Sequence, residues 1–247
     1  MRLARLIGRR LIGVLLGAVV ISGCTVRPTG HGSVAGTLPS ALCPKAELDA
    51  GSLVDCVSAD VSTFWTNRLH RPINEPLFVD PRPAAVPRAC RPFLSFGTAF
   101  FCTNNSTVYL THKAVTRDQK TFGIFLPWAL ATIVSHEIGH VVQQAVQQPG
   151  FDSRSDAVSR KLEQQADCLS GVWAYAKVKA GQLDAAGFRL TERRELEAVS
   201  SLPTPGDLSG YNEVRTHGTV AERVAALSKG LASGDPASCD LAKPLGS

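Results

Sequence analysis

Apolar residues recur every three to four positions in several stretches of the chain, which is the spacing of one face of an α-helix. This spacing predicts helices within residues 53–69, 128–146, 153–181, 184–202 and 219–231. Short apolar runs predict strands at 77–79 and 107–111, and residues 90–102 are expected to form a loop or hairpin. We therefore expect an α+β protein that is mainly helical with a small sheet.

Local signals mark the ends of three of these helices. Pro127 stands where the first turn of a helix tolerates proline. Ser153 with Asp156, and Thr219 with Glu222, have the spacing of capping boxes, which would begin the helices that follow them. The last of these helices is expected to bury one apolar face, formed by Val220, Val224, Leu227 and Leu231.

The first 23 residues have the features of an export signal. Arginines precede an uncharged apolar stretch, 11–21, which is too short to cross a membrane comfortably. The stretch ends in Ile21-Ser22-Gly23-Cys24, which is similar to the bacterial lipobox, so Cys24 is expected to be lipidated. The alternative is an ordinary secretory signal with an incidental cysteine. We expect a signal peptide at 1–23, a flexible tether at 24–45, one domain at 46–240 and a tail at 241–247.

The net charge of +5 does not indicate a nucleic-acid-binding protein. Arg2, Arg5, Arg9 and Arg10 all lie in the export signal, whereas none of the 21 acidic residues does. The remainder is nearly neutral and contains no basic patch, so no nucleic-acid partner is expected.

Six cysteines follow Cys24, and an even number in an exported chain is typical of a disulfide framework. The sequence permits 15 pairings, of which we expect Cys43 with Cys56, Cys90 with Cys102, and Cys168 with Cys239. Cys168 directly follows Asp167, so a thiolate metal ligand is its alternative use. On a helix it would point about 100° away from its neighbour, which favours the disulfide.

His136-Glu137-Ile138-Gly139-His140 is the main candidate for chemistry. On a helix, the two histidines project from one face and can share a metal ion, for which zinc is the expected occupant. Glu137 stands beside them, placed to act on a water molecule rather than to bind the metal. Gly139 removes side-chain bulk and would let another backbone or a substrate approach.

A second acidic motif, 163–167, supplies the remaining carboxylates. Glu163 is expected to complete the metal site from a second helix, and Asp167, one turn later, to accept the free N–H of a ligand histidine. The alternative is a pair of charges on a solvated helix face.

The sequence also offers candidate hydrogen-bond donors for the oxyanion of a tetrahedral intermediate. His217 lies just before the last predicted helix and could serve, with Tyr211 and Tyr109 as rivals and a structural histidine as the alternative. The predicted strand at 107–111 could form the upper edge of a substrate cleft, or be an ordinary sheet strand.

These motifs together resemble the bacterial neutral zinc metallopeptidases, a family with thermolysin-like HExxH and ExxxD signatures. The resemblance runs through 136–143, 162–173, His217-Gly218-Thr219, Arg223 and Gly234-Asp235-Pro236, and more loosely through Phe64-Trp65, Cys102 and Val108-Tyr109-Leu110. It implies a zincin-like fold, with the sheet beside the active-site helix. It also implies that His136, His140 and Glu163 are zinc ligands, that Glu137 is the catalytic base and that His217 is a motif residue.

We therefore expect a zinc peptidase that acts on peptides or proteins and is anchored by lipid on the extracytoplasmic side of a bacterial membrane. The alternative is a non-catalytic, zinc-stabilised surface lipoprotein that binds a peptide or cell-wall partner. A maturation factor for a single partner protein is a third possibility.

Overall fold

The computed structural model describes residues 42–43, 50–73, 77–78, 86–96, 99–123, 126–151, 155–200 and 213–241, which all belong to one unit, 34–247. The predicted signal peptide, Cys24 and Tyr211 lie outside the described residues, as do most of the tether and of the tail. Leu42 and Cys43, which were assigned to the tether, are buried against the core. The packed region therefore begins by Leu42, earlier than residue 46.

The helical segments include the five predicted helices and additional short segments. The longer helices are α2 (Ala50–Leu69), α3 (His112–Phe122), α4 (Leu126–Ala145), α5 (Asp156–Lys179), α6 (Ala185–Ser200) and α8 (Val220–Ser233). The short ones are α7 (Glu213–His217) and the 3₁₀ segments η2 (Arg88–Phe96) and η5 (Pro236–Cys239). Helices α3 and α7 were not predicted, and η2 occupies much of the expected loop at 90–102. Polar residues hide α3 from a periodicity argument, although Thr111 caps it by accepting from the amide of Ala114.

One capping prediction is confirmed and the other is wrong. Thr219 and Glu222 form a reciprocal capping box at the start of α8. The N-cap of α5 is Ser155, whose side chain makes no capping hydrogen bond, rather than the predicted Ser153, which lies outside the described residues.

The sheet has three strands in the order β1–β3–β2: β1 (Leu77–Phe78), β3 (Thr107–Leu110) and β2 (Ala99–Cys102). Strand β3 pairs in parallel with β1 and in antiparallel fashion with β2, which contacts every residue of β3. Both β2 and β3 contact α4, so the sheet lies beside the helix that carries the histidines. Strand β1 pairs only with Tyr109 and Leu110 of β3, so the role of residues 107–111 as the upper edge of a substrate cleft stays a prediction.

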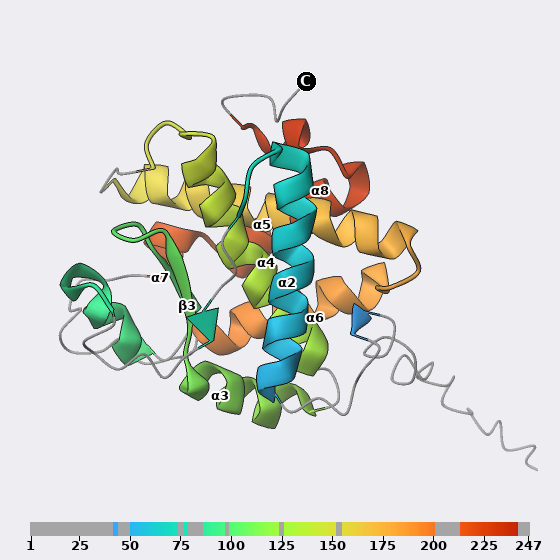
Figure 1. The fold of residues 1–247 in the computed structure, drawn as a ribbon, viewed down its shortest axis with the longest axis horizontal. Helices are drawn as coiled ribbons and strands as arrows, with labels where there is room; N and C mark the ends of the chain where they lie inside the picture. Colours follow the sequence, from blue (N-terminus) through green and yellow to red (C-terminus); the bar gives the residue numbers. More distant parts are fainter. Residues whose placement is uncertain are drawn as a thin grey trace, which may run out of the picture. The chain divides into compact units, whose positions relative to one another are not determined.

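Helix α5 lies between α4 and α8, and α2 crosses α4 (Figure 1). Glycine residues allow α5 to approach α4 and α8 closely. A Cβ atom at Gly139 would lie 2.9 Å from the Cα atom of Ala166, and one at Gly171 would lie 2.1 Å from the carbonyl oxygen of Leu227. As predicted for Gly139, the missing side chain admits another backbone, which here is that of α5.

Three disulfides have the predicted pairing: Cys43–Cys56, Cys90–Cys102 and Cys168–Cys239. The main apolar core includes Val57, Val61 and Trp65, which recur at helical spacing along α2. Within the described part of the chain, no helix is long and apolar enough to cross a membrane.

Candidate metal centre

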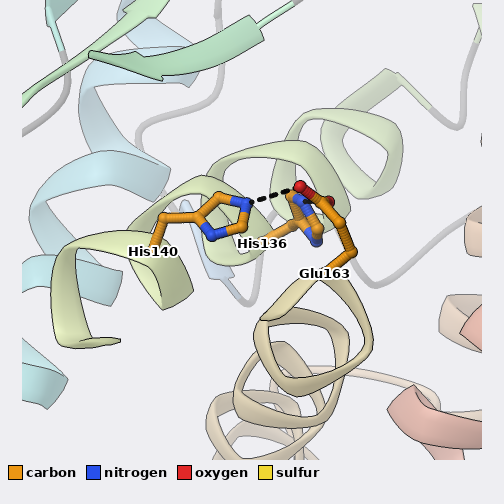
Figure 2. Close-up of side chains that lie close together, drawn as sticks. All are labelled: His136, His140 and Glu163. Carbon is orange, nitrogen blue, oxygen red and sulfur yellow. Dashed lines mark ion pairs between the residues drawn. The ribbon is translucent and has the colours of Figure 1, made fainter. Parts of the chain in front are cut away.

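Helices α4 and α5 bring together three side chains that could hold a metal ion (Figure 2). His136 and His140 project from α4, and Glu163 projects from α5 toward both of them. Glu163 Oε2 lies 3.1 Å from His136 Nε2, and Glu163 Oε1 lies 3.5 Å from His140 Nε2. The three side chains are only 11–13 % exposed. The structure thus brings together the three residues that the sequence indicated as ligands.

One ligand atom from each of these three residues lies within 4.8 Å of the other two, close enough for them to hold one ion. The distances of 3.1 and 3.5 Å join the two imidazoles to different oxygens of the Glu163 carboxylate, so this carboxylate faces both rings. Two imidazoles and one carboxylate also form a donor set typical of catalytic zinc.

The hydrogen bonds of His136 direct its Nε2 lone pair toward this point. Its Nδ1 atom lies 2.7 Å from Asp167 Oδ1, so Nδ1 carries the proton of the neutral ring. Glu163 Oε2 is buried and accepts no hydrogen bond. His136 Nε2 and this buried oxygen therefore face each other at 3.1 Å, and a bound cation could take the place of a proton between them.

Asp167 lies where the sequence placed it, behind the first histidine. It is fully buried and also accepts from Arg223, at 2.8 Å from Nε to Oδ2 and 2.8 Å from Nη2 to Oδ1. Burial raises the pKa of Asp167, but the Arg223 guanidinium outweighs this effect and lowers it, so Asp167 is an anion. In the metal-free protein this carboxylate outweighs the effect of burial on His136 and raises the pKa of His136 to about 10.

The role of Arg223 was missed by the sequence analysis, although a signal for it existed. The buried residues of α8 are Arg223, Leu227, Gly230 and Leu231. Leu227 and Leu231 of the predicted apolar face are buried, whereas Val220 and Val224 are only partly buried. An arginine four residues before a buried leucine lies on the same helix face, which indicates a buried acidic partner.

Glu137 is buried next to the histidines and is not part of the three-residue cluster. Burial raises the pKa of its carboxyl, and the nearby charge of His136 partly opposes that shift. Its side chain makes no hydrogen bond or ion pair with another described residue. A raised pKa makes a carboxylate a stronger proton acceptor than an ordinary exposed glutamate.

His217 lies next to the same site, beside Glu163. Its Nε2 atom lies 3.5 Å from Glu163 Oε1, and its Nδ1 atom lies 2.9 Å from Thr216 Oγ1. It is the last residue of α7, two positions before the N-cap of α8. Burial raises the pKa of Glu163, but the charges of His217 and His140 outweigh it and hold that pKa well below its usual range.

The rival Tyr109 belongs to a different part of the structure. It is buried in a small apolar cluster with Val86, Cys90 and Phe100. Its hydroxyl accepts a hydrogen bond of 2.8 Å from Asn105. The geometry therefore favours His217 over Tyr109 as a donor near the metal ligands.

Comparisons with known proteins agree with this geometry. A family model described as "Putative neutral zinc metallopeptidase" matches residues 6–242. YpfJ of Escherichia coli K12 is 28 % identical over 158 residues, 57 % of this chain and 53 % of the relative. Rv2575 of Mycobacterium tuberculosis H37Rv is 29 % identical over 177 residues, 63 % of this chain and 58 % of the relative. Both are described as uncharacterized, and the chain spans little more than half of their length. No solved structure matches this chain.

Proposed function

Because this chain belongs to the family described as "Putative neutral zinc metallopeptidase", we propose that it is a zinc-dependent peptidase that hydrolyses extracytoplasmic peptides or proteins. The convergence of His136, His140 and Glu163 is the observation that carries the proposal. When bound, zinc supplies Lewis acidity for the scissile carbonyl and lowers the pKa of water to about 7.

The side chains around the metal ligands would handle the protons of the reaction. Glu137 accepts a proton from the attacking water at its carboxylate and delivers that proton to the leaving amine nitrogen. Its raised pKa brings the carboxyl closer to neutral pH, where it can both accept and release the proton. His217 is our candidate for donating a hydrogen bond to the oxyanion that develops from the carbonyl.

The buried pair behind His136 would keep that ligand in place. Asp167 accepts a hydrogen bond from Nδ1 of His136, and the Arg223 guanidinium keeps the Asp167 carboxylate ionised. The His136 ring is thereby oriented with Nε2 available for the metal throughout the reaction.

Glu137→Gln should separate zinc binding from hydrolysis. The variant should retain one zinc ion per chain, because Glu137 lies outside the three-ligand cluster, and lose cleavage of a peptide library. His140→Ala and Glu163→Ala should lose both, whereas neutralising the exposed Glu197 (Glu197→Gln) should lose neither. Zinc content by atomic spectroscopy and cleavage with and without a chelator are the measurements.

Two outcomes would contradict the proposal. Cleavage by Glu137→Gln at the wild-type rate would remove Glu137 from the mechanism. Wild-type protein that holds zinc but shows no chelator-sensitive cleavage would instead support the non-catalytic, zinc-stabilised surface lipoprotein.

We further propose that the protein is anchored to the extracytoplasmic side of a bacterial membrane through lipidated Cys24. The arginine-rich start, the short apolar stretch and the sequence before Cys24 support this location. The three disulfides also suit an oxidising compartment. Metabolic labelling with a fatty acid should mark the wild-type chain and not Cys24→Ser.

A further inference from the structure

The second ligand histidine is supported by an uncharged side chain, Gln143, one turn after His140 on α4. The amide of Gln143 is fully buried. Its Oε1 atom lies 2.9 Å from His140 Nδ1, and its Nε2 atom donates to the carbonyl oxygen of Leu162 at 2.7 Å and to Gln165 Oε1 at 3.0 Å. Both ends of the buried amide are therefore paired.

The orientation of this amide is set by groups that can only accept. A backbone carbonyl has no proton to give, so the Gln143 atom facing Leu162 must be the NH₂ group. Gln165 is oriented in the same way, because its Nε2 atom donates to the carbonyl oxygens of Cys239 (2.9 Å) and Asp240 (3.0 Å). Gln165 therefore presents Oε1 to Gln143, and Gln143 presents Oε1 to His140.

This chain of hydrogen bonds determines which nitrogen of His140 can bind a metal. Because Gln143 Oε1 accepts, His140 Nδ1 must carry the ring proton, and the lone pair remains on Nε2, which points toward Glu163. The Gln143 amide cannot be flipped without cost, because its Oε1 atom would then face two other acceptors, the Leu162 carbonyl oxygen and Gln165 Oε1. The fixed amide therefore stabilises the His140 tautomer that carries its proton on Nδ1.

This series of hydrogen bonds ends at the carbonyl oxygens of Cys239 and Asp240, in a segment that a disulfide joins to α5. Cys239 and Asp240 close η5, and the Cys168–Cys239 disulfide joins that segment to α5 close to Gln165. The two ligand histidines are thus supported differently. His136 rests on a buried ion pair, and His140 rests on neutral amides that lead to backbone carbonyls.

We propose that Gln143 is a positioning residue for the metal centre, which holds the proton of His140 on Nδ1 and is itself oriented by Gln165 and the carbonyl oxygens of Cys239 and Asp240. The inference rests on the proposed zinc site and does not depend on peptide hydrolysis. It assigns a function to two buried glutamines that the ligand set alone leaves unexplained.

Zinc affinity of the full chain, measured by competition with a chromogenic chelator, tests the proposal. Gln143→Met keeps a long side chain but removes the acceptor, and it should weaken zinc binding by about 10–100-fold. Gln165→Met leaves the acceptor on Gln143 but releases its orientation, so it should cause a smaller loss. The matched control is Gln144→Met on the next, partly exposed position, whose side chain reaches only the carbonyl oxygen of Thr103 at 3.4 Å. It should bind zinc as the wild type does.

Nuclear magnetic resonance of the zinc-loaded chain gives a readout that general loosening of the fold would not reproduce. The wild type should show two slowly exchanging ring N–H protons, on Nδ1 of His136 and of His140. In Gln143→Met the His140 signal should be lost to solvent exchange while the His136 signal persists, because its acceptor Asp167 is untouched.

Each outcome decides the matter. Wild-type zinc affinity in folded Gln143→Met, or equal loss of both ring N–H signals, would overturn the proposal. Wild-type protein that binds zinc without cleaving peptides would defeat the peptidase function and leave this inference standing. Wild-type protein with no zinc affinity would defeat both.

Discussion

Replacing Asp167 should affect folding and zinc binding through two separable interactions. Asp167 is fully buried, and it accepts one hydrogen bond from His136 Nδ1 and two from the Arg223 guanidinium. Asp167→Leu has the same branching as the native side chain but no charge and no acceptor. It would leave the buried Arg223 guanidinium without a counterion.

The two losses have different magnitudes. Breaking a buried ion pair by removing one partner costs about 3–5 kcal/mol, a large share of the ~5–15 kcal/mol that stabilises a typical domain. Loss of the acceptor behind a ligand histidine weakens metal binding by about 10–100-fold, or ~1.4–2.7 kcal/mol. The unpaired Arg223, whose Nη2 atom lies 3.2 Å from His136 Nδ1, should weaken zinc binding further by charge repulsion.

A second substitution separates these effects. In the double variant Asp167→Leu with Arg223→Met, no buried charge is left unpaired, so most of the stability should return. The acceptor for His136 is still missing, so the 10–100-fold loss of zinc affinity should remain. Urea unfolding in the presence of a chelator measures the first quantity, and chelator competition measures the second.

Either of two results would refute this reasoning. If the double variant were as unstable as Asp167→Leu, the ion pair would not be the source of the lost stability. If the double variant bound zinc as tightly as the wild type, Asp167 would not support His136 as a ligand.

Two further predictions concern the helix spacing and a buried carboxyl. Gly139→Ala would place a Cβ atom 2.9 Å from the Cα atom of Ala166, so α4 and α5 must separate. We expect a loss of about 1–3 kcal/mol in urea unfolding and weaker zinc binding, because Glu163 moves away with α5; unchanged values for both would contradict this. Glu195→Gln tests a buried carboxyl whose pKa is raised to about 8 by burial and by the nearby charge of Asp118. Folding of the wild type takes up a proton at Glu195 between about pH 4.5 and 8, so the contribution of Glu195 to stability falls as the pH rises through that window. Because the glutamine cannot titrate, the stability of the variant relative to the wild type should increase from pH 5 to pH 8, and a difference that is constant with pH would count against the shift.

The sequence alone was sufficient for features that depend on short-range spacing. His136 and His140 are four residues apart, as are Glu163 and Asp167, and on a helix each pair must share a face whatever surrounds it. The capping box of Thr219 is local in the same sense, since it joins residues three positions apart.

Long-range contacts were beyond the reach of these local arguments. The central place of β3 depends on which strands pair with it, and its apolar pattern is the same at the centre or at the edge of a sheet. Arg223 meets Asp167, and Gln165 meets the carbonyl oxygens of Cys239 and Asp240, across separations of 56 and about 75 residues. No periodicity reports such contacts.

The sequence by itself thus indicated a metal site built from histidines and carboxylates, and the two helices, α4 and α5, on which these residues lie. Only the tertiary structure decided that α4 and α5 approach closely enough for Glu163 to meet two imidazoles, because that distance depends on Gly139 facing Ala166. It also decided how the imidazoles are held, by a buried ion pair on one side and a chain of neutral amides on the other, since a buried polar group needs a partner that only folding brings into contact.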